Sequence, residues 1–108
     1  MIDGNKRIEI TKHAQERLDQ RVRPKTRGLH NEFLSNPSNA KRALDSVVNR
    51  NRHALVPVEG KIDPRGGRFY DTEFESYDGI IPLRCLIRED HLVTLWARGG
   101  WRKRVIQS

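Results

Sequence analysis

Two periods of hydrophobic residues, first helical and then alternating, follow each other along the chain. Residues 7–10 alternate polar and apolar side chains and predict a short strand, after which Thr11 can cap a helix. From Lys12 to about Val22 the apolar positions recur every four residues, as on a helix with one buried stripe. Arg23 should end this helix, because a residue that precedes a proline avoids helical backbone angles.

The next segment predicts a loop and a second helix. Residues 24–37 have the composition of a loop with a short turn at 32–34, and residues 35–38 offer helix caps. A helix should run from about Asn39 to Asn51, where the apolar positions again fall on one stripe. That stripe consists of Ala40, Leu44, Val47 and Val48.

After His53, short apolar alternations replace the helical period and predict four strands. Asp78-Gly79 and Glu89-Asp90 are turn signals, so the last three strands should form an antiparallel meander. Pro82 cannot donate a ladder hydrogen bond and indicates an edge or a bulge. The strands should cover residues 55–58, 69–74, 80–87 and 92–97.

This order of elements predicts an α+β fold, in which an N-terminal strand and two helices pack on a mainly antiparallel sheet of about four to five strands. The 108 residues are enough for one domain. We expect residues 1–98 to form that domain. Residues 99–108 should form a basic tail, which the Gly99-Gly100 pair would make flexible.

The net charge of +7 is unevenly distributed. Lysines and arginines outnumber aspartates and glutamates by 12 to 6 in residues 1–53 and by 4 to 0 in residues 98–108, whereas residues 54–97 carry 5 against 8. A segregated basic excess attracts phosphates, because their counterions are released on binding. The distribution indicates RNA or another polyanion as the partner.

The cysteine content and the apolar runs restrict the compartment. Cys85 is the only cysteine, which excludes an internal disulfide and a cysteine zinc site and favours a reducing, cytoplasmic location. No apolar run is long enough for a signal peptide or a membrane span, so no membrane contact is expected. Cys85 alternates with Leu83 and Ile87 and is expected in the core rather than as a nucleophile.

Neither a metal nor another cofactor is expected. Asp71, Glu73 and Glu75 alternate on one predicted strand and could converge on magnesium or manganese. Adjacent carboxylates without a paired histidine are more often an exposed sheet face.

His13, Arg17 and Arg21 stand four residues apart in the first predicted helix and form a cationic stripe beside its core stripe. This stripe could border a cleft where the helix meets the sheet. Histidine transfers protons near neutral pH, and two guanidinium groups could hold phosphoryl oxygens while a ribose 2′-hydroxyl attacks. A solvated helix face without a catalytic role has the same spacing.

Residues 10–22 resemble the opening of a widespread family of small bacterial and phage domains. These domains begin with a strand and a helix of the pattern TKHAxxRxxxR and close with a strand like residues 92–96. They look like members of the barnase, EndoU, colicin and RelE superfamily of metal-independent ribonucleases, many of which are toxins. The resemblance covers the two ends of the chain, roughly a quarter of it. It implies catalytic roles for His13, Arg17, Arg21 and Thr94.

Further basic residues are candidate nucleic-acid contacts. Trp101 in the tail could stack on a base while its basic neighbours contact phosphates, although a frayed, solvated terminus has the same composition. Trp96 is expected to pack in the core rather than to stack on a base. The candidate phosphate contacts are Lys12, Arg98, Arg102, Lys103 and Arg104.

Two functions follow from these observations. The first is a metal-independent endoribonuclease, toxin-like or phage-encoded, that cleaves RNA through the 2′-hydroxyl and requires His13. The second is a non-catalytic basic module, for which the arginines matter and the histidine does not. Such a module would bind nucleic acid or an acidic protein, such as an antitoxin or the host target of a small phage-encoded inhibitor.

Overall fold

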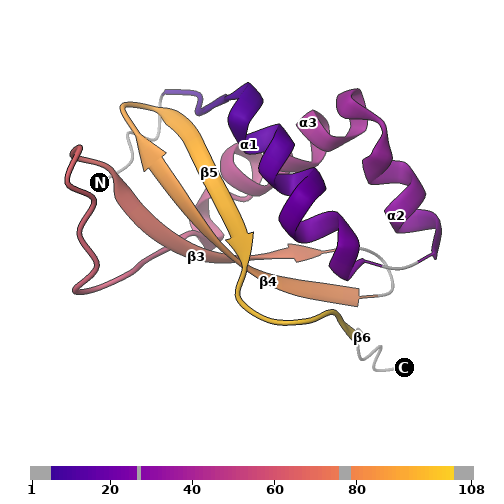
Figure 1. Cartoon of the computed structure of the whole chain (residues 1–108). Helices are drawn as coiled ribbons and strands as arrows, with labels where there is room; N and C mark the ends of the chain where they lie inside the picture. Colours follow the sequence, from indigo (N-terminus) through magenta and orange to yellow (C-terminus); the bar gives the residue numbers. More distant parts are fainter. Residues whose placement is uncertain (1–5, 27, 76–78, 104–108) are drawn as a thin grey trace.

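The computed structural model describes residues 6–26, 28–75 and 79–103. Within these ranges, three α-helices lie on one face of a six-stranded mixed sheet (Figure 1), which confirms the expected α+β class. The strand order is β1-β5-β4-β3-β2, and β6 pairs with the beginning of β4. The strands are β1 (Glu9–Ile10), β2 (Val56–Pro57), β3 (Arg68–Glu75), β4 (Gly79–Arg88), β5 (His91–Ala97) and β6 (Arg102–Lys103).

The first helix begins and continues as predicted. Helix α1 (Lys12–Arg17) is followed without a break by a π-helical segment (Leu18–Val22) and a short 3-10 turn (Arg23–Lys25). The Thr11 hydroxyl accepts a hydrogen bond from the backbone N–H of Ala14 and donates one to the carbonyl of Leu92 in β5. One side chain therefore caps the helix and fixes it to the sheet.

Helix α2 (Gly28–Ser35) occupies most of the segment predicted as a loop, so that prediction was wrong. Its buried anchor is Leu34, whereas the neighbouring Phe33 is 46% exposed. Between Pro24 and Pro37 the sequence has only three apolar residues, Leu29, Phe33 and Leu34. They are too few to show a helical period, which is why the pattern failed to indicate this helix. Helix α3 (Pro37–Asp45) and its π-helical extension (Ser46–Arg50) correspond to the second predicted helix.

The strands β3, β4 and β5 form the predicted antiparallel meander. Its second turn is Glu89-Asp90, where both residues adopt left-handed angles with φ of 49° and 63°. The Asp78-Gly79 turn lies partly outside the described residues. β1 runs parallel to β5, which alternation along single strands could not indicate.

Pro82 lies in the central strand β4, not at an edge, but it faces an interruption of the sheet. On the β5 side of β4, β5 ends opposite Leu83, and β6 begins opposite Ile80. The Pro82 carbonyl accepts a hydrogen bond from the backbone N–H of Arg98 at 2.8 Å. Because neither β5 nor β6 pairs with β4 at Pro82, no neighbouring strand needs the N–H group that proline lacks.

A bulge in β5 changes which side chains reach the core. Leu86 pairs with Thr94 but Ile87 pairs with Leu92, so Val93 is an extra residue in β5. Leu92 and Leu95 are therefore both fully buried. Val93, which strict alternation assigns to the core face, is half-buried instead.

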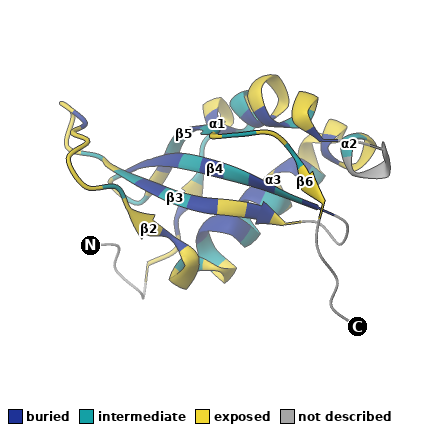
Figure 2. Cartoon of the chain, turned by 90° about the horizontal axis from the view of Figure 1, so that it is seen from below, coloured by how far each residue is buried: buried dark blue, intermediate teal, exposed yellow. Residues whose placement is uncertain are grey.

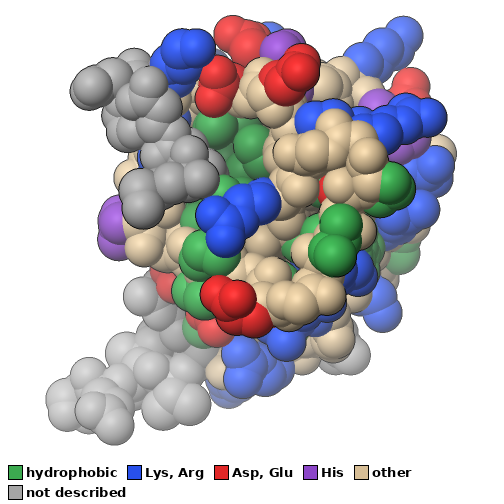
Figure 3. Space-filling view, turned by 90° about the vertical axis from the view of Figure 1, so that its left-hand side faces the viewer, with side chains coloured by type: hydrophobic (Ala, Val, Ile, Leu, Met, Phe, Trp, Pro, Cys, Tyr) green, Lys and Arg blue, Asp and Glu red, His purple; other side chains and the backbone are tan. Residues whose placement is uncertain are grey.

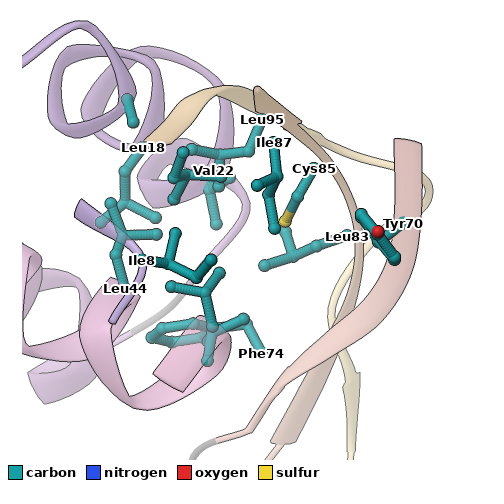
Figure 4. Packing of buried hydrophobic residues seen from close by; sticks show 14 of the residues in the cluster. Ile8, Leu18, Val22, Leu44, Tyr70, Phe74, Leu83, Cys85, Ile87 and Leu95 are labelled. Carbon is teal, nitrogen blue, oxygen red and sulfur yellow. The ribbon is translucent and has the colours of Figure 1, made fainter. Parts of the chain in front are cut away.

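The core lies between the helices and one face of the sheet (Figure 4). The predicted helix stripe of Ala14, Leu18 and Val22 is fully buried against it. Cys85 is fully buried on β4, and burial raises the pKa of its thiol to about 12. An uncharged buried thiol is a poor nucleophile, which agrees with a packing role.

The opposite face of the sheet is open except where a loop crosses it. Buried and exposed residues alternate along β3 in the view of this face (Figure 2). The loop of residues 58–67 is held by the buried Asp63 carboxylate, which accepts hydrogen bonds from the Gly67 N–H and the Arg88 guanidinium, both at 2.8 Å. No helix in the described ranges is long and apolar enough to cross a membrane.

Candidate nucleic-acid interface

The cationic flank, which we define as His13, Arg17 and Arg21, lies along α1 and its π-helical extension. Ala14, Leu18 and Val22 face the sheet, so residues one position earlier lie about 100° around the helix. The right-handed turn of the helix directs them away from α3, toward the outer edge of β5 (Figure 1). Within the described residues this edge pairs with β1 only at His91 and Leu92.

The flank brings an imidazole and a guanidinium into contact. Arg17 Nε donates to His13 Nε2 at 3.2 Å, and Arg17 Nη1 donates to Gln20 Oε1 at 2.8 Å. In this contact Arg17 is the donor and His13 Nε2 is the acceptor. The Arg17 fork is thus held in place without a carboxylate partner.

Most charge pairs of the molecule lie elsewhere. Six arginines form salt bridges with carboxylates, whereas no described carboxylate forms one with Arg17, Arg21 or Lys12. His13, Arg21 and Lys12 are exposed. Lysine and arginine side chains also gather along the right-hand side of the face drawn in Figure 3. The flank therefore keeps positive charge that can attract an anion.

Thr94 is not on the same face of the sheet as α1. It pairs with Leu86, while its neighbour Leu95 points into the core below the helices. The Thr94 side chain therefore lies on the open face, where it is half-buried. The structure brings His13 and Arg17 together but leaves Thr94 on the other side of β5.

The described part of the C-terminal segment packs on the sheet. Trp101 is half-buried against the core, and a Cβ at Gly79 would overlap its indole ring. Arg98 and Arg102 lie 3.4 Å from carboxylates of β3, those of Asp71 and Glu73. Lys103 is exposed in β6, and Arg104 lies outside the described residues.

Of two hollows among the described residues, neither is lined by the flank or by Thr94. The larger is a groove of about 770 Å³ along β3, which includes Phe33, Val47 and Phe74 in its wall. The smaller, of about 400 Å³, is lined by Leu55, Tyr70 and their neighbours. Neither hollow therefore supports a cleft at the cationic flank, whose catalytic role stays a prediction.

Sequence reasoning missed a charged layer on the open face. Arg84 holds Asp71 through two hydrogen bonds of 2.7 and 3.0 Å, and these bonds keep the pKa of that carboxyl below its usual value. Nearby, Lys61 Nζ lies 4.8 Å from the ring centre of Phe69 and 5.0 Å from that of Trp96. Asp71 and Arg84 lie opposite each other because they are equally far along the chain from the turn between β3 and β4. The sequence does contain the signal for this turn.

No group of three or more histidine, cysteine, aspartate or glutamate side chains in the described ranges is arranged to hold a metal ion. The three carboxylates of β3 are instead an exposed to half-buried sheet face, and arginines neighbour two of them.

Comparison with known proteins adds no assignment. A scan against protein-family models, a search of curated proteins and a search of solved structures found no match to this chain.

Proposed function

We propose that the protein binds RNA through the cationic flank. The observation that supports this most strongly is the geometry of Arg17, which is fixed by His13 and Gln20 while no described carboxylate neutralises it. A pre-positioned guanidinium fork presents two donors to a phosphate and loses little freedom on binding. Arg21, next along the helix, adds a second cation for the adjoining phosphate.

The test compares two variants that lose the same charge. Binding of a fluorescein-labelled single-stranded RNA of mixed sequence is followed by anisotropy as a function of salt. Arg17→Gln/Arg21→Gln should weaken binding and reduce the slope of log K against log salt by about 1.4, because each phosphate contact on a single strand contributes about 0.7. Lys41→Gln/Arg42→Gln, exposed on α3, should leave the slope nearly unchanged. Equal effects of the two double variants would exclude the flank as the binding site.

Cleavage of the bound RNA is a second candidate, favoured by the contact between His13 and Arg17. Once Arg17 turns from His13 Nε2 to the phosphate, that nitrogen could accept the 2′-hydroxyl proton while the arginine stabilises charge on the phosphorus centre. The ribose oxygen then bonds to phosphorus, the 5′-oxygen leaves and takes up a proton, and a 2′,3′-cyclic phosphate remains.

Incubation of varied RNAs with the protein in EDTA separates the two candidates. If cleavage occurs, cyclic phosphate ends should accumulate, and His13→Ala should abolish them while it weakens RNA binding less than Arg17→Gln/Arg21→Gln does. If wild type and His13→Ala are equally inert, the protein is a binding module. If RNA does not bind but an acidic polypeptide such as polyglutamate does, the polyanion is a protein.

A further inference from the structure

The groove along β3 lies between the free edge of that strand and the helices above it. On the helix side it is lined by Ala43, Val47 and Phe33, which is 46% exposed. Val56 of β2, which is 60% exposed, also lines it. Phe74 closes it from the core face of β3. The groove is thus open to solvent, and polar residues such as Ser46, Asn51 and Thr72 line it beside these apolar ones.

The floor of the groove is an edge of β3 that β2 covers over only part of its length. The Phe69 carbonyl accepts a hydrogen bond from the Val58 N–H, so it points toward β2, and the backbone groups of every second residue after it point the same way. β2 pairs with β3 only as far as Asp71. Among the described residues, the outward N–H and C=O groups of Glu73 and Glu75 therefore have no strand partner.

The groove is acidic, although the molecule is strongly basic. Three carboxylates line it, those of Asp71, Glu73 and Glu75, against one guanidinium, that of Arg98. Asp71 is already held by Arg84 and lies 3.4 Å from Arg98, and Glu73 has a surface contact of 3.4 Å with Arg102. No described cation forms a salt bridge with Glu75, which is exposed.

We propose that this groove binds an extended basic segment of another protein, which adds to the sheet as a strand beside β3. Residues of the added strand opposite Glu73 and Glu75 share the face of these carboxylates, so lysine or arginine is favoured there. The residue between them faces the hollow beside Phe74 and Val47, where an aliphatic side chain fits. The recognised pattern is basic–aliphatic–basic.

A second copy of this chain does not fit the same edge. Antiparallel pairing of two β3 edges about Phe74 would place Glu73 of one copy opposite Glu75 of the other. Like charges directly opposite each other destabilise a strand pair. The carboxylates on this edge of β3 therefore disfavour pairing with a second copy of the chain and favour a cationic partner.

The experiment uses the capped peptide Thr-Lys-Val-Lys-Val-Lys-Thr and isothermal titration calorimetry. This lysine peptide should bind saturably at one site, whereas the analogue with glutamates in place of lysines should not bind. A lysine peptide that is N-methylated on the amides facing β3 keeps its charge but cannot form the ladder, and it should bind at least about tenfold more weakly.

Matched protein variants locate the site. Glu73→Lys/Glu75→Lys should weaken binding of the lysine peptide about tenfold or more, because two attractive cross-strand pairs become repulsive. Glu9→Lys/Glu16→Lys, which reverses two charges at exposed sites of β1 and α1, should change it less than about twofold. Circular dichroism melts show that each variant is folded. Absence of binding, equal binding of the N-methylated peptide, or equal affinities of the Glu73/Glu75 and Glu9/Glu16 variants would each overturn the proposal.

Discussion

At the scale of single residues, Asp63 has the clearest dependence on pH. The hydrogen bond from Arg88 is the largest cause that lowers the pKa of the Asp63 carboxyl from 3.8 to about 2, and the backbone N–H groups of Gly67 and Arg65 add to it. A carboxyl whose folded pKa is depressed stabilises the fold above its unfolded pKa and loses that contribution as the pH falls through the folded value. The relevant window is therefore about pH 4 to 2.

We predict that Asp63→Asn lowers the melting temperature at pH 7 and that its difference from wild type narrows as the pH falls from 4 to 2. Protonation of wild-type Asp63 then removes the charge that the substitution has already removed. Thermal melts by circular dichroism measure the difference. Glu59→Gln, an exposed substitution near the start of the same loop, should leave the melting temperature unchanged. A constant difference across this range would show that Asp63 acts by shape and not by charge.

Single residues also show how much of the candidate site could be predicted from the sequence. The spacing of His13, Arg17 and Arg21 is a local property of a helix, so the stripe could be predicted, and the structure brings the first two into contact. Thr94 could not be placed in the same way. Its face depends on the Val93 bulge and on strand register, which long-range pairing determines.

At the scale of elements, the start of α1 depends on one hydroxyl. Thr11 both accepts from the Ala14 N–H at 3.1 Å and donates to the Leu92 carbonyl at 2.7 Å. Among the described residues, the Asn36 side chain at the start of α3 accepts a hydrogen bond from the Ser38 N–H and forms none with the sheet. The two caps thus differ by one hydrogen bond to the sheet.

We predict that Thr11→Ala lowers the free energy of unfolding by about 2 kcal/mol and Asn36→Ala by about 1 kcal/mol. Thr11→Ser keeps both hydrogen bonds and loses only a methyl group, so it should retain most of the stability. Urea denaturation followed by circular dichroism gives all three values. If Thr11→Ala and Thr11→Ser were equally destabilising, packing of the methyl group would explain the effect and capping would not.

The elements that the sequence predicted correctly are those with strong local signals. The cap and four-residue period of α1 and the alternating strands of the meander depend on neighbours along the chain. Helix α2 and β6 have no such signals. Leu34 anchors the first by tertiary contact, and Trp101 packs beside the second, so both require the assembled core.

At the scale of the whole molecule, opposite charges lie at opposite edges of the sheet. The cationic flank lies beside the outer edge of β5, and the acidic groove follows β3 on the far side of β4. Composition gave the excess of positive charge but could not give this separation, because strand order decides it. An acidic edge on a basic protein also protects an exposed strand from pairing with its own copies.

This protection can be removed without altering the core, since Glu73 and Glu75 are exposed. We predict that Glu73→Thr/Glu75→Thr promotes association through paired β3 edges, because threonine favours strands and pairs well across them. Sedimentation velocity at increasing concentration should show dimers for this variant and a monomer for wild type. Glu9→Thr/Glu16→Thr removes the same charge from β1 and α1 and serves as the control. If the control also dimerises, the change in net charge explains the association. If only the Glu73/Glu75 variant dimerises, the unprotected edge of β3 explains it.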